Sequence, residues 1–447
     1  MTWDNTDAAD HGLLSPYWAG TMIAASTGDA AVLRAILDAE VALATAQSRL
    51  GLVPDTAAET IRNTARGLTP DAARLAAASR SGGNPIIPLL AGLRAAVGPD
   101  AAGFVHLGAT SQDILDTALM LVAQRSIRAI MADLDTAVAA LAHIAVDHRT
   151  TPMAGRTLTQ HSVPITFGLK AAVWLVGVAD ARTHLRAVAE SLPAQLSGAA
   201  GTLAAFHQLL PGRELELVDA FAAELGLRSP PMPWHTMRTP VMRLADALSG
   251  VCGPLGTIGA DVSLLSRTEI GELSEATGGG SSSMPQKHNP VRSVLLQSAA
   301  RQGPGLAAEL HRSAIAVDER PDGAWHAEWQ PLRGLLRVAG GAACLAADLL
   351  PGLHVDAKRM LANLSLTGPL IVAERIMLVA GPILGKPRVQ QLVAESAGDP
   401  SSLRTKLRAE LSEWSDAAID ELIDPANYLG SSSELIDRAL AHVRADG

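Results

Sequence analysis

The sequence predicts an all-α protein, built as three helical domains with a long helical bundle at its centre. Of its 447 residues, 48% are hydrophobic but only 3% are aromatic, and alanine is abundant. Small side chains let helices approach one another closely, which favours packed bundles over a sheet sandwich. Apolar residues also recur at helical spacing over long stretches. A chain of this length exceeds one ordinary core, so two or three domains are expected.

Residues 1–105 are predicted to form the first helical domain. One apolar stripe follows a spacing of three and four residues: Leu33, Ile36, Leu37, Val41 and Ala44. Gly51 is expected to end that helix. Further breaks are expected at Pro54, at Pro70 and within residues 81–85, so the helices of this domain should be short.

Residues 106–350 are predicted to form the central bundle. Five long helical stretches fall there: residues 116–148, 164–192, 241–274, 291–311 and 325–350. Their apolar content exceeds what one bundle shields, so part of each surface is expected to face other subunits. Residues 351–447 are predicted to form a third domain of shorter helices. No segment shows convincing strand alternation.

The bulk properties exclude several classes of function. The chain has 36 basic and 45 acidic residues, a net charge of −9 and no basic run, so a nucleic-acid partner is not expected. The N-terminus lacks a basic-then-apolar signal segment. The most apolar stretch, residues 247–265, carries Asp261 and suits a buried helix better than a membrane span. Cys252 and Cys344 are expected to be reduced core thiols. A soluble, cytoplasmic protein with no membrane partner is expected.

Residues 278–290, GGGSSSMPQKHNP, form the most informative segment. The glycines free the backbone, and the serines place hydroxyl and N–H groups where a turn can cradle an anion. Lys287 adds a positive charge, His288 a titratable group, and Asn289 a neutral donor and acceptor. A solvated, flexible linker has the same composition. The ordered sequence is more specific than the composition and favours a loop that closes over an anion.

Residues 106–117 place Thr110 and Ser111 where a long helix is expected to begin. Unpaired N–H groups at such a helix start attract carboxylates. The alternative is helix capping alone, by Ser111 with Asp113 and Asp116 in the first turn.

Residues 156–164 carry His161 shortly before Pro164, where another long helix is expected to start. A histidine at this place can transfer protons, and the alternative is a surface or capping histidine. No histidine stands in a spacing with cysteine or glutamate that indicates a metal site, so no metal is expected.

These three segments resemble, in order and separation, the three signature regions of the fumarase/aspartase superfamily. Residues 280–290 match its G-S-S-x-M-P-x-K-x-N-P signature at every fixed position. The resemblance implies an enzyme that moves a proton at the carbon next to a carboxylate, with addition or elimination at the neighbouring carbon and no cofactor. It also implies a homotetramer in which three subunits share each site.

The resemblance also implies roles for particular residues. Ser281 matches the acid/base that acts on carbon, and His161 is the second expected catalytic residue. Five residues are expected to bind the carboxylates of a small polycarboxylate substrate: Thr110, Ser111, Lys287, Asn289 and Arg238.

Two departures from the patterns of other members narrow the choice among the branches of the superfamily. Leu158 stands where fumarases and aspartases have histidine, and Val294 stands where fumarases and adenylosuccinate lyases have a glutamate that supports the histidine. His161 lies where adenylosuccinate lyases and carboxymuconate cycloisomerases have theirs. Four further segments resemble the cycloisomerases: residues 82–89, 197–205, 233–238 and 325–329.

The main expectation from these features is a 3-carboxy-cis,cis-muconate cycloisomerase, an enzyme of protocatechuate breakdown. In that reaction a substrate carboxylate adds within the molecule, so no leaving group has to be protonated and a glutamate-backed acid is less necessary. The alternative is a C–N lyase that releases fumarate from adenylosuccinate or from an amino- or nitrosuccinate. A non-catalytic structural protein is a further alternative, which intact Ser281, Lys287 and His161 disfavour.

Overall fold

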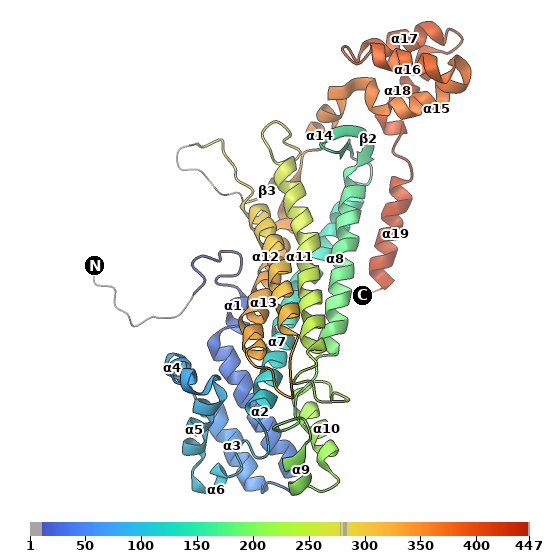
Figure 1. Cartoon of the computed structure of the whole chain (residues 1–447). Coiled ribbons are helices and arrows are strands. Elements are labelled where there is room, and N and C mark those ends of the chain that lie inside the picture. Colours follow the sequence, from blue (N-terminus) through green and yellow to red (C-terminus); the bar gives the residue numbers. More distant parts are fainter. Residues whose placement is uncertain (1–10, 278, 280–283, 446–447) are drawn as a thin grey trace. The chain divides into compact units, whose positions relative to one another are not determined.

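The computed structural model describes residues 11–277, 279 and 284–445, and these residues are mostly helical, as the sequence predicts (Figure 1). They form two compact units. The first comprises Met1–Leu134, Ala181–Gly256 and Ser298–Leu345, and the second comprises Asp135–Asp180, Thr257–Gln297 and Ala346–Gly447. The boundaries fall inside five long helices: α7 (Ser111–Asp147), α8 (Phe167–Glu190), α11 (Thr239–Leu265), α12 (Val291–Ser313) and α13 (Ala324–Leu349).

The first unit begins with short helices around α2. The helices that lie wholly in this unit are α1 (Met22–Ser26), α2 (Asp29–Arg49), α3 (Asp55–Gly67), α4 (Ala72–Gly82), α5 (Ile86–Val97), α6 (Pro99–Ala102), α9 (Ala204–Leu209) and α10 (Glu214–Leu225). The predicted stripe of α2 is confirmed, because Leu33, Ile36 and Leu37 are buried. The helix ends at Arg49, and Gly51 follows with a φ of 77°.

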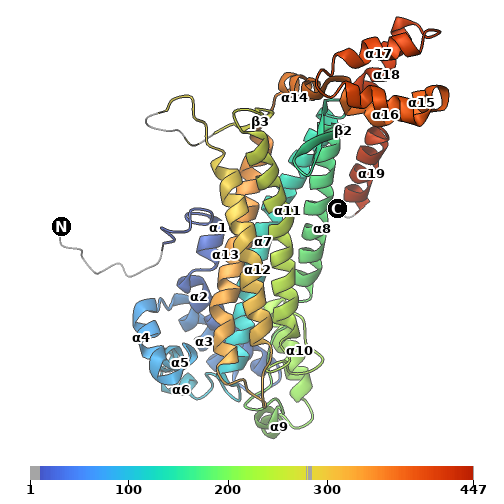
Figure 2. The ribbon, with the colours of Figure 1, turned by 45° about the horizontal axis from the view of Figure 1, so that its top comes forward.

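Small residues stand where helices of the first unit touch. A Cβ on Gly303 of α12 would lie 2.9 Å from the Sγ of Cys252 on α11, and one on Gly340 of α13 would lie 2.5 Å from Ile23 of α1. Side chains of Leu306 and Leu335 also fill the space between α12 and α13, which run side by side in both ribbon views (Figures 1 and 2). Side chains larger than glycine at residues 303 and 340 would force these helices apart.

The second unit contains strands, contrary to the expectation of none. Strands β1 (Pro152–Thr157) and β2 (Gln160–Thr166) form an antiparallel hairpin. Its turn residues, Leu158 and Thr159, have φ angles of 47° and 71°, which L side chains rarely adopt. Pro164 therefore lies in a strand, and α8 begins at Phe167 instead of near residue 164.

A second strand pair corrects the expected helix at residues 241–274. Helix α11 ends at Leu265, and β3 (Leu273–Glu275) pairs with β4 (Leu353–Val355), which follows the short 3-10 helix η1 (Leu350–Gly352). Both β3 and β4 are only three residues long, too short for a sequence alternation to reveal them.

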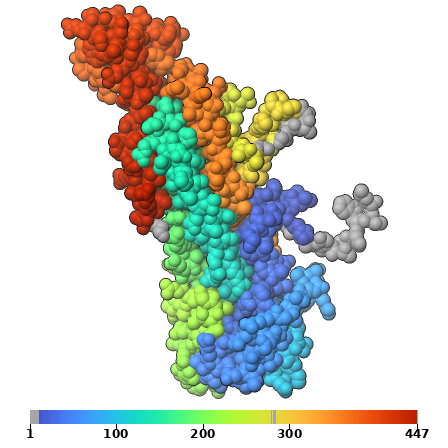
Figure 3. Space-filling model, turned by 180° about the vertical axis from the view of Figure 1, so that it is seen from behind, coloured from blue at the N-terminus to red at the C-terminus, as the bar shows by residue number. Residues whose placement is uncertain are grey.

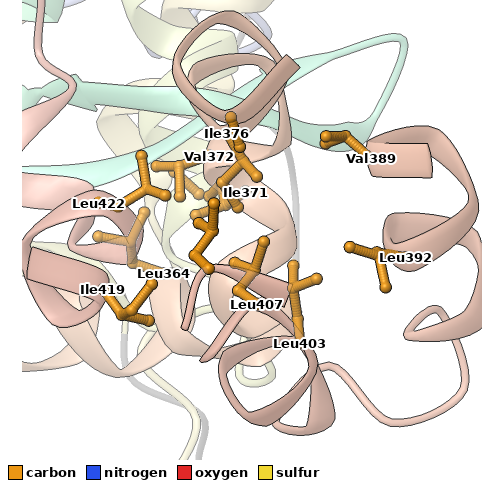
Figure 4. Close-up of a cluster of buried hydrophobic side chains, with 13 residues drawn as sticks. Leu364, Ile371, Val372, Ile376, Val389, Leu392, Leu403, Leu407, Ile419 and Leu422 are labelled. Atoms are coloured by element: carbon orange, nitrogen blue, oxygen red, sulfur yellow. The ribbon is translucent and has the colours of Figure 1, made fainter. Parts of the chain in front are cut away.

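The chain after β4 folds into short helices. In order they are α14 (Ala357–Leu364), η2 (Ser365–Val372), α15 (Ala373–Leu384), α16 (Lys386–Glu395), α17 (Ser402–Glu410), α18 (Asp416–Ile423), η3 (Pro425–Asn427) and α19 (Ser432–Ala445). The helices from α14 to α18 surround one apolar cluster (Figure 4). The red C-terminal helix α19 stands out at the surface (Figure 3). It is tied to α8 by a 2.8 Å contact between His442 and Asp180.

In the part of the chain that the structure describes, four helical stretches are long and apolar enough to cross a bilayer by length and composition alone: Ser111–Asp147, Thr239–Leu265, Ala324–Gly352 and Ala357–Leu384. Between 33% and 61% of their most apolar windows is buried inside the protein, so the fold itself uses much of this apolar surface. Cys252 is buried and Cys344 is partly buried, and neither is in a disulfide bond.

Candidate active site

Paired backbone segments hold the two ends of the signature segment together. The N–H of Gly279 donates to the carbonyl of Asn289 at 3.0 Å, and the N–H of Asn289 donates back to the carbonyl of Gly279 at 3.1 Å. A Cβ on Gly279 would lie 2.5 Å from a methyl group of the exposed Val291, so a larger residue there would have to displace that side chain. Ser281, the expected acid/base, lies outside the described residues.

The carboxylate of Glu275 fixes the start of α12, which follows the signature segment directly. Its Oε1 accepts hydrogen bonds from the backbone N–H of Ser293 at 2.9 Å and from the Ser293 hydroxyl at 2.7 Å. Its Oε2 accepts from the N–H of Arg292 at 3.2 Å. These bonds satisfy N–H groups that a helix start leaves unpaired, and so they fix the backbone next to Asn289.

Lys287 and Asn289 line a cavity of about 550 Å³ in the second unit. Arg267, His288 and His354 also line it, so the cavity gathers two permanent positive charges and two imidazoles. Carboxylates of Glu269, Glu275 and Asp356 lie on its wall as well. Glu275 and Asp356 cap α12 and α14. Lys287 is exposed at this cavity, where its ammonium group can meet an anion.

His161 lies on β2 and is half-buried. Its Nδ1 is 3.2 Å from the hydroxyl oxygen of Thr367 on η2. The pKa of His161 is lowered from the ordinary 6.5 by burial and by the positive charge of Arg156, against a smaller opposing effect of Glu272. The imidazole is therefore mainly neutral at neutral pH.

The carboxylate that acts on this imidazole, that of Glu272, already has hydrogen-bond partners. Glu272 is fully buried and accepts hydrogen bonds from two nitrogens of Arg156, at 2.6 and 3.0 Å. The side-chain amide of Asn363 donates to the same carboxylate at 2.8 Å. Sequence reasoning missed this cluster, since its members lie 91 to 207 positions apart and meet only in the fold.

Thr110 and Ser111 stand at the start of α7, as predicted, and belong to the first unit. The Thr110 hydroxyl accepts a hydrogen bond of 2.7 Å from Nη2 of Arg320, which also donates to the carbonyl of Ala199 at 3.0 Å. Sequence reasoning missed Arg320, although a cation in the polar stretch between two long helices was a usable signal. The pair places a guanidinium beside a helix start, an arrangement suited to a carboxylate or nitro group.

A buried carboxylate holds the Thr110 segment in place. Asp113 accepts hydrogen bonds from the N–H groups of Thr110, Ser197 and Gly198 at 2.9 to 3.0 Å. Nε2 of His235 lies 2.9 Å from the same carboxylate. The Ser197 hydroxyl contacts both His235 and Asp113, and all three side chains are at most 3% exposed. This cluster is a structural support, because a nucleophilic serine would have to be open to substrate.

Arg238 has a structural role in this geometry, and its expected substrate-binding role is not favoured. Its guanidinium donates to Asp116 at 2.8 and 3.0 Å, to Glu328 at 2.7 and 3.0 Å, and to the carbonyl of Trp234 at 3.1 Å. These bonds use all five of its N–H groups. Burial would lower the pKa of Arg238, but the two carboxylates outweigh burial and raise it.

The expected site residues divide between the two units. Thr110, Ser111 and Arg238 belong to the first, and His161, Lys287 and Asn289 belong to the second. Within the second unit, the described residues lining the 550 Å³ cavity do not include His161. Among the described residues, no group of three or more His, Cys, Asp or Glu side chains is arranged to hold a metal ion.

Comparison with known proteins identifies relatives that match nearly the whole chain. Residues 24–305 match the family model described as lyase. A nitrosuccinate lyase from Streptomyces davaonensis is 49% identical over 96% of this chain and 94% of its own length. A 3-carboxy-cis,cis-muconate cycloisomerase from Pseudomonas aeruginosa is 40% identical over 99% and 98%. The crystal structure of the 3-carboxy-cis,cis-muconate lactonizing enzyme from Pseudomonas putida superposes with a TM-score of 0.91, at 35% identity over 97% and 99% of the two chains.

Proposed function

Because the chain belongs to the lyase family of the fumarase/aspartase superfamily, we propose that it is a C–N lyase that converts nitrosuccinate to fumarate and nitrite. A relative that is 49% identical over 96% of the chain carries the name nitrosuccinate lyase. The state of His161 is the structural observation that supports this choice.

The cycloisomerase activity expected from the sequence is wrong. Relatives named 3-carboxy-cis,cis-muconate cycloisomerase share 33% to 40% identity with the chain, clearly less than the relative named nitrosuccinate lyase. The alternative reading of the sequence, a C–N lyase that releases fumarate, is the better supported one. The features that indicated a cycloisomerase are compatible with either reaction.

The proposed reaction balances without a cofactor. A base removes a proton from the CH₂ carbon of nitrosuccinate, the C–H electron pair forms the C=C bond of fumarate, and the C–N electron pair leaves with nitrite. No external oxidant or reductant takes part. The hydrogen on the nitro-bearing carbon is the more acidic one. Placement must therefore select the productive hydrogen, which is the kind of work that oriented anion-binding residues do.

The residues have complementary tasks in this proposal. Ser281, by its match to the signature, is the base that acts on carbon. Lys287 and Asn289 bind one carboxylate of the substrate, and Thr110, Ser111 and Arg320 bind a second anionic group. The lining of the cavity by Lys287 and Asn289, and the 2.7 Å bond between Arg320 and Thr110, support these assignments.

A neutral His161 suits nitrite as the leaving group. Nitrite is a weak base and departs as an anion, so it does not need a proton at the moment of C–N cleavage. An amine leaving group is far more basic and requires a general acid. His161 has a lowered pKa and a hydroxyl partner, and Glu272 is occupied by Arg156, so a proton-donating role is disfavoured. Instead, a neutral imidazole offers one N–H donor to a substrate oxygen.

We propose that a homotetramer assembles the site, as the superfamily resemblance implies, and that the enzyme is cytoplasmic. Mixing the Ser281→Ala variant with His161→Ala, which lacks any side-chain donor, then restores activity, because some sites receive both intact residues from different subunits. With full subunit exchange at equal amounts, activity should reach about one quarter of the wild-type value. Nitrite release is measured after exchange has been confirmed by mass spectrometry. No recovery after confirmed exchange would place both residues in one chain.

Lys287→Met should raise KM for nitrosuccinate about 10- to 100-fold, because a charge-assisted bond to a carboxylate is lost, while kcat falls much less. Lys386→Met on α16 removes another exposed lysine that does not line the cavity and should leave KM unchanged. Steady-state kinetics on both variants test whether Lys287 binds the substrate. An unaltered KM in Lys287→Met would contradict the assigned role.

A substrate panel tests the proposed activity. Values of kcat/KM are measured with nitrosuccinate, adenylosuccinate and 3-carboxy-cis,cis-muconate, by fumarate formation for the first two and loss of diene absorbance for the third. The proposal predicts a preference of at least about 100-fold for nitrosuccinate. A preference for either of the other two compounds would overturn it.

A further inference from the structure

We propose that Thr367 is a positioning residue for His161: its hydroxyl donates a hydrogen bond to Nδ1 and keeps the ring proton on Nε2, where it can be donated to an oxygen of the substrate. This inference rests on the role proposed above for His161. It adds a residue that lies outside the three signature regions, 206 positions after His161 in the sequence.

The local backbone fixes the Thr367 hydroxyl next to the ring. Thr367 lies in η2, which packs against β2, and its Oγ1 is 3.2 Å from Nδ1 of His161. Gly368 follows with φ 49° and ψ −145°, and Pro369 restricts the next residue. A Cβ on Gly368 would lie 3.0 Å from Pro400, so the segment is held from its other side as well. A hydroxyl on such a constrained segment orients a ring more firmly than one on a free loop.

The charged groups around His161 explain why a hydroxyl is a suitable partner. Arg156 on β1 and Glu272 just before β3 are the charged side chains that act on the ring, and η2 contains no charged residue. Glu272 is neutralised by two bonds from Arg156 and one from Asn363. A free carboxylate at Nδ1 would stabilise the protonated ring, whereas a hydroxyl leaves it neutral.

The chemistry of the substrate fixes the direction of the bond. Carboxylate and nitro oxygens accept hydrogen bonds and cannot donate them, so the nitrogen that meets the substrate must carry a proton. In a neutral imidazole only one nitrogen does. If Nε2 carries it, Nδ1 is an acceptor, and the Thr367 hydroxyl must be the donor at Nδ1.

Two substitutions separate the hydroxyl from the shape of the side chain. Thr367→Val removes the hydroxyl at nearly equal volume, and Thr367→Ser retains it. We expect kcat/KM for nitrosuccinate to fall about 2- to 10-fold in Thr367→Val, as for the loss of one hydrogen bond, and to stay near wild type in Thr367→Ser. Equal thermal unfolding of the two variants shows that the fold is retained. A Thr367→Ser variant as impaired as Thr367→Val would overturn the inference.

The pH dependence tests the direction of the bond. A bond donated to Nδ1 stabilises the neutral ring, so its loss raises the pKa of His161 from its lowered value toward the ordinary 6.5. The pH at which His161 titrates, followed by its ring C–H resonances in NMR, should therefore move to higher pH in Thr367→Val and stay in place in Thr367→Ser. A titration midpoint at the same pH in all three proteins would overturn the inference.

A second readout is independent of turnover. Diethyl pyrocarbonate modifies neutral imidazoles, and peptide mapping by mass spectrometry gives the modification rate of His161 as a function of pH. The midpoint should rise in Thr367→Val relative to wild type and to Thr367→Ser. If wild type releases no nitrite but this midpoint still rises, the proposed function fails and the Thr367 inference stands. An identical midpoint in all three proteins would refute the inference.

Discussion

Ser281→Ala is expected to lower kcat for nitrite release at least about 100-fold, because it removes the group that takes the proton from carbon. The substrate-binding residues remain, so KM should change much less than kcat. Steady-state kinetics on nitrosuccinate, with nitrite and fumarate both measured, give the two constants separately.

Ser283→Ala is the matched control. Ser283 is part of the same serine run but occupies the variable position of the signature, so its loss should change kcat less than about threefold. Gel filtration and circular dichroism of both variants should match wild type. Turnover at the wild-type rate in Ser281→Ala would remove this serine from the mechanism.

Arg238→Met is expected to lower the free energy of unfolding by about 3–5 kcal/mol. The substitution leaves Asp116 and Glu328 buried without their cation, and both are at most 2% exposed. The Nε1–H of Trp325 donates to Asp116 at 2.9 Å, which offsets only a small part of this loss. Urea unfolding followed by circular dichroism measures the change.

Arg243→Met serves as the control for that experiment. Arg243 lies on α11, which begins directly after Arg238, but is exposed, so its loss should change stability by no more than about 0.5 kcal/mol. An Arg238→Met protein of wild-type stability with a greatly raised KM would contradict the structural role and restore the substrate-binding role expected from the sequence.

The helical part of the fold was predictable because its signals are local. The apolar stripe of α2 and the start of α7 at Ser111 both follow from spacing and capping residues. The β1–β2 hairpin was not predictable in this way. Its turn residues, Leu158 and Thr159, have positive φ angles. Asparagine and glycine are the usual residues at such turn positions, so the sequence lacks the common hairpin signal.

The site was predictable only in part, for a similar reason. Thr110 and Lys287 stand in segments whose composition itself indicates anion binding. Arg238 has no local feature that distinguishes a buried structural arginine from a substrate-binding one. Its partners, Asp116 and Glu328, are 122 and 90 positions away in the sequence and meet it only through packing of α7, α11 and α13.

The residues that were expected to distinguish a cycloisomerase from a C–N lyase do not distinguish them. Val294 indicates that no glutamate supports a general acid, which fits an addition without a leaving group. It fits equally well an elimination whose leaving group is a weak base. A cycloisomerase and a nitrosuccinate lyase can therefore both lack the supporting glutamate, because neither reaction needs a strong acid. The choice between them rests on the overall similarity to the relative named nitrosuccinate lyase.

Simultaneous time courses of nitrite and fumarate in one reaction with nitrosuccinate test the central claim most directly. We expect nitrite and fumarate to appear in equal amounts at every time, at a rate proportional to enzyme concentration. Formation of both products should be largely lost in Ser281→Ala. Fumarate without nitrite, or no reaction of nitrosuccinate with the intact enzyme, would contradict it.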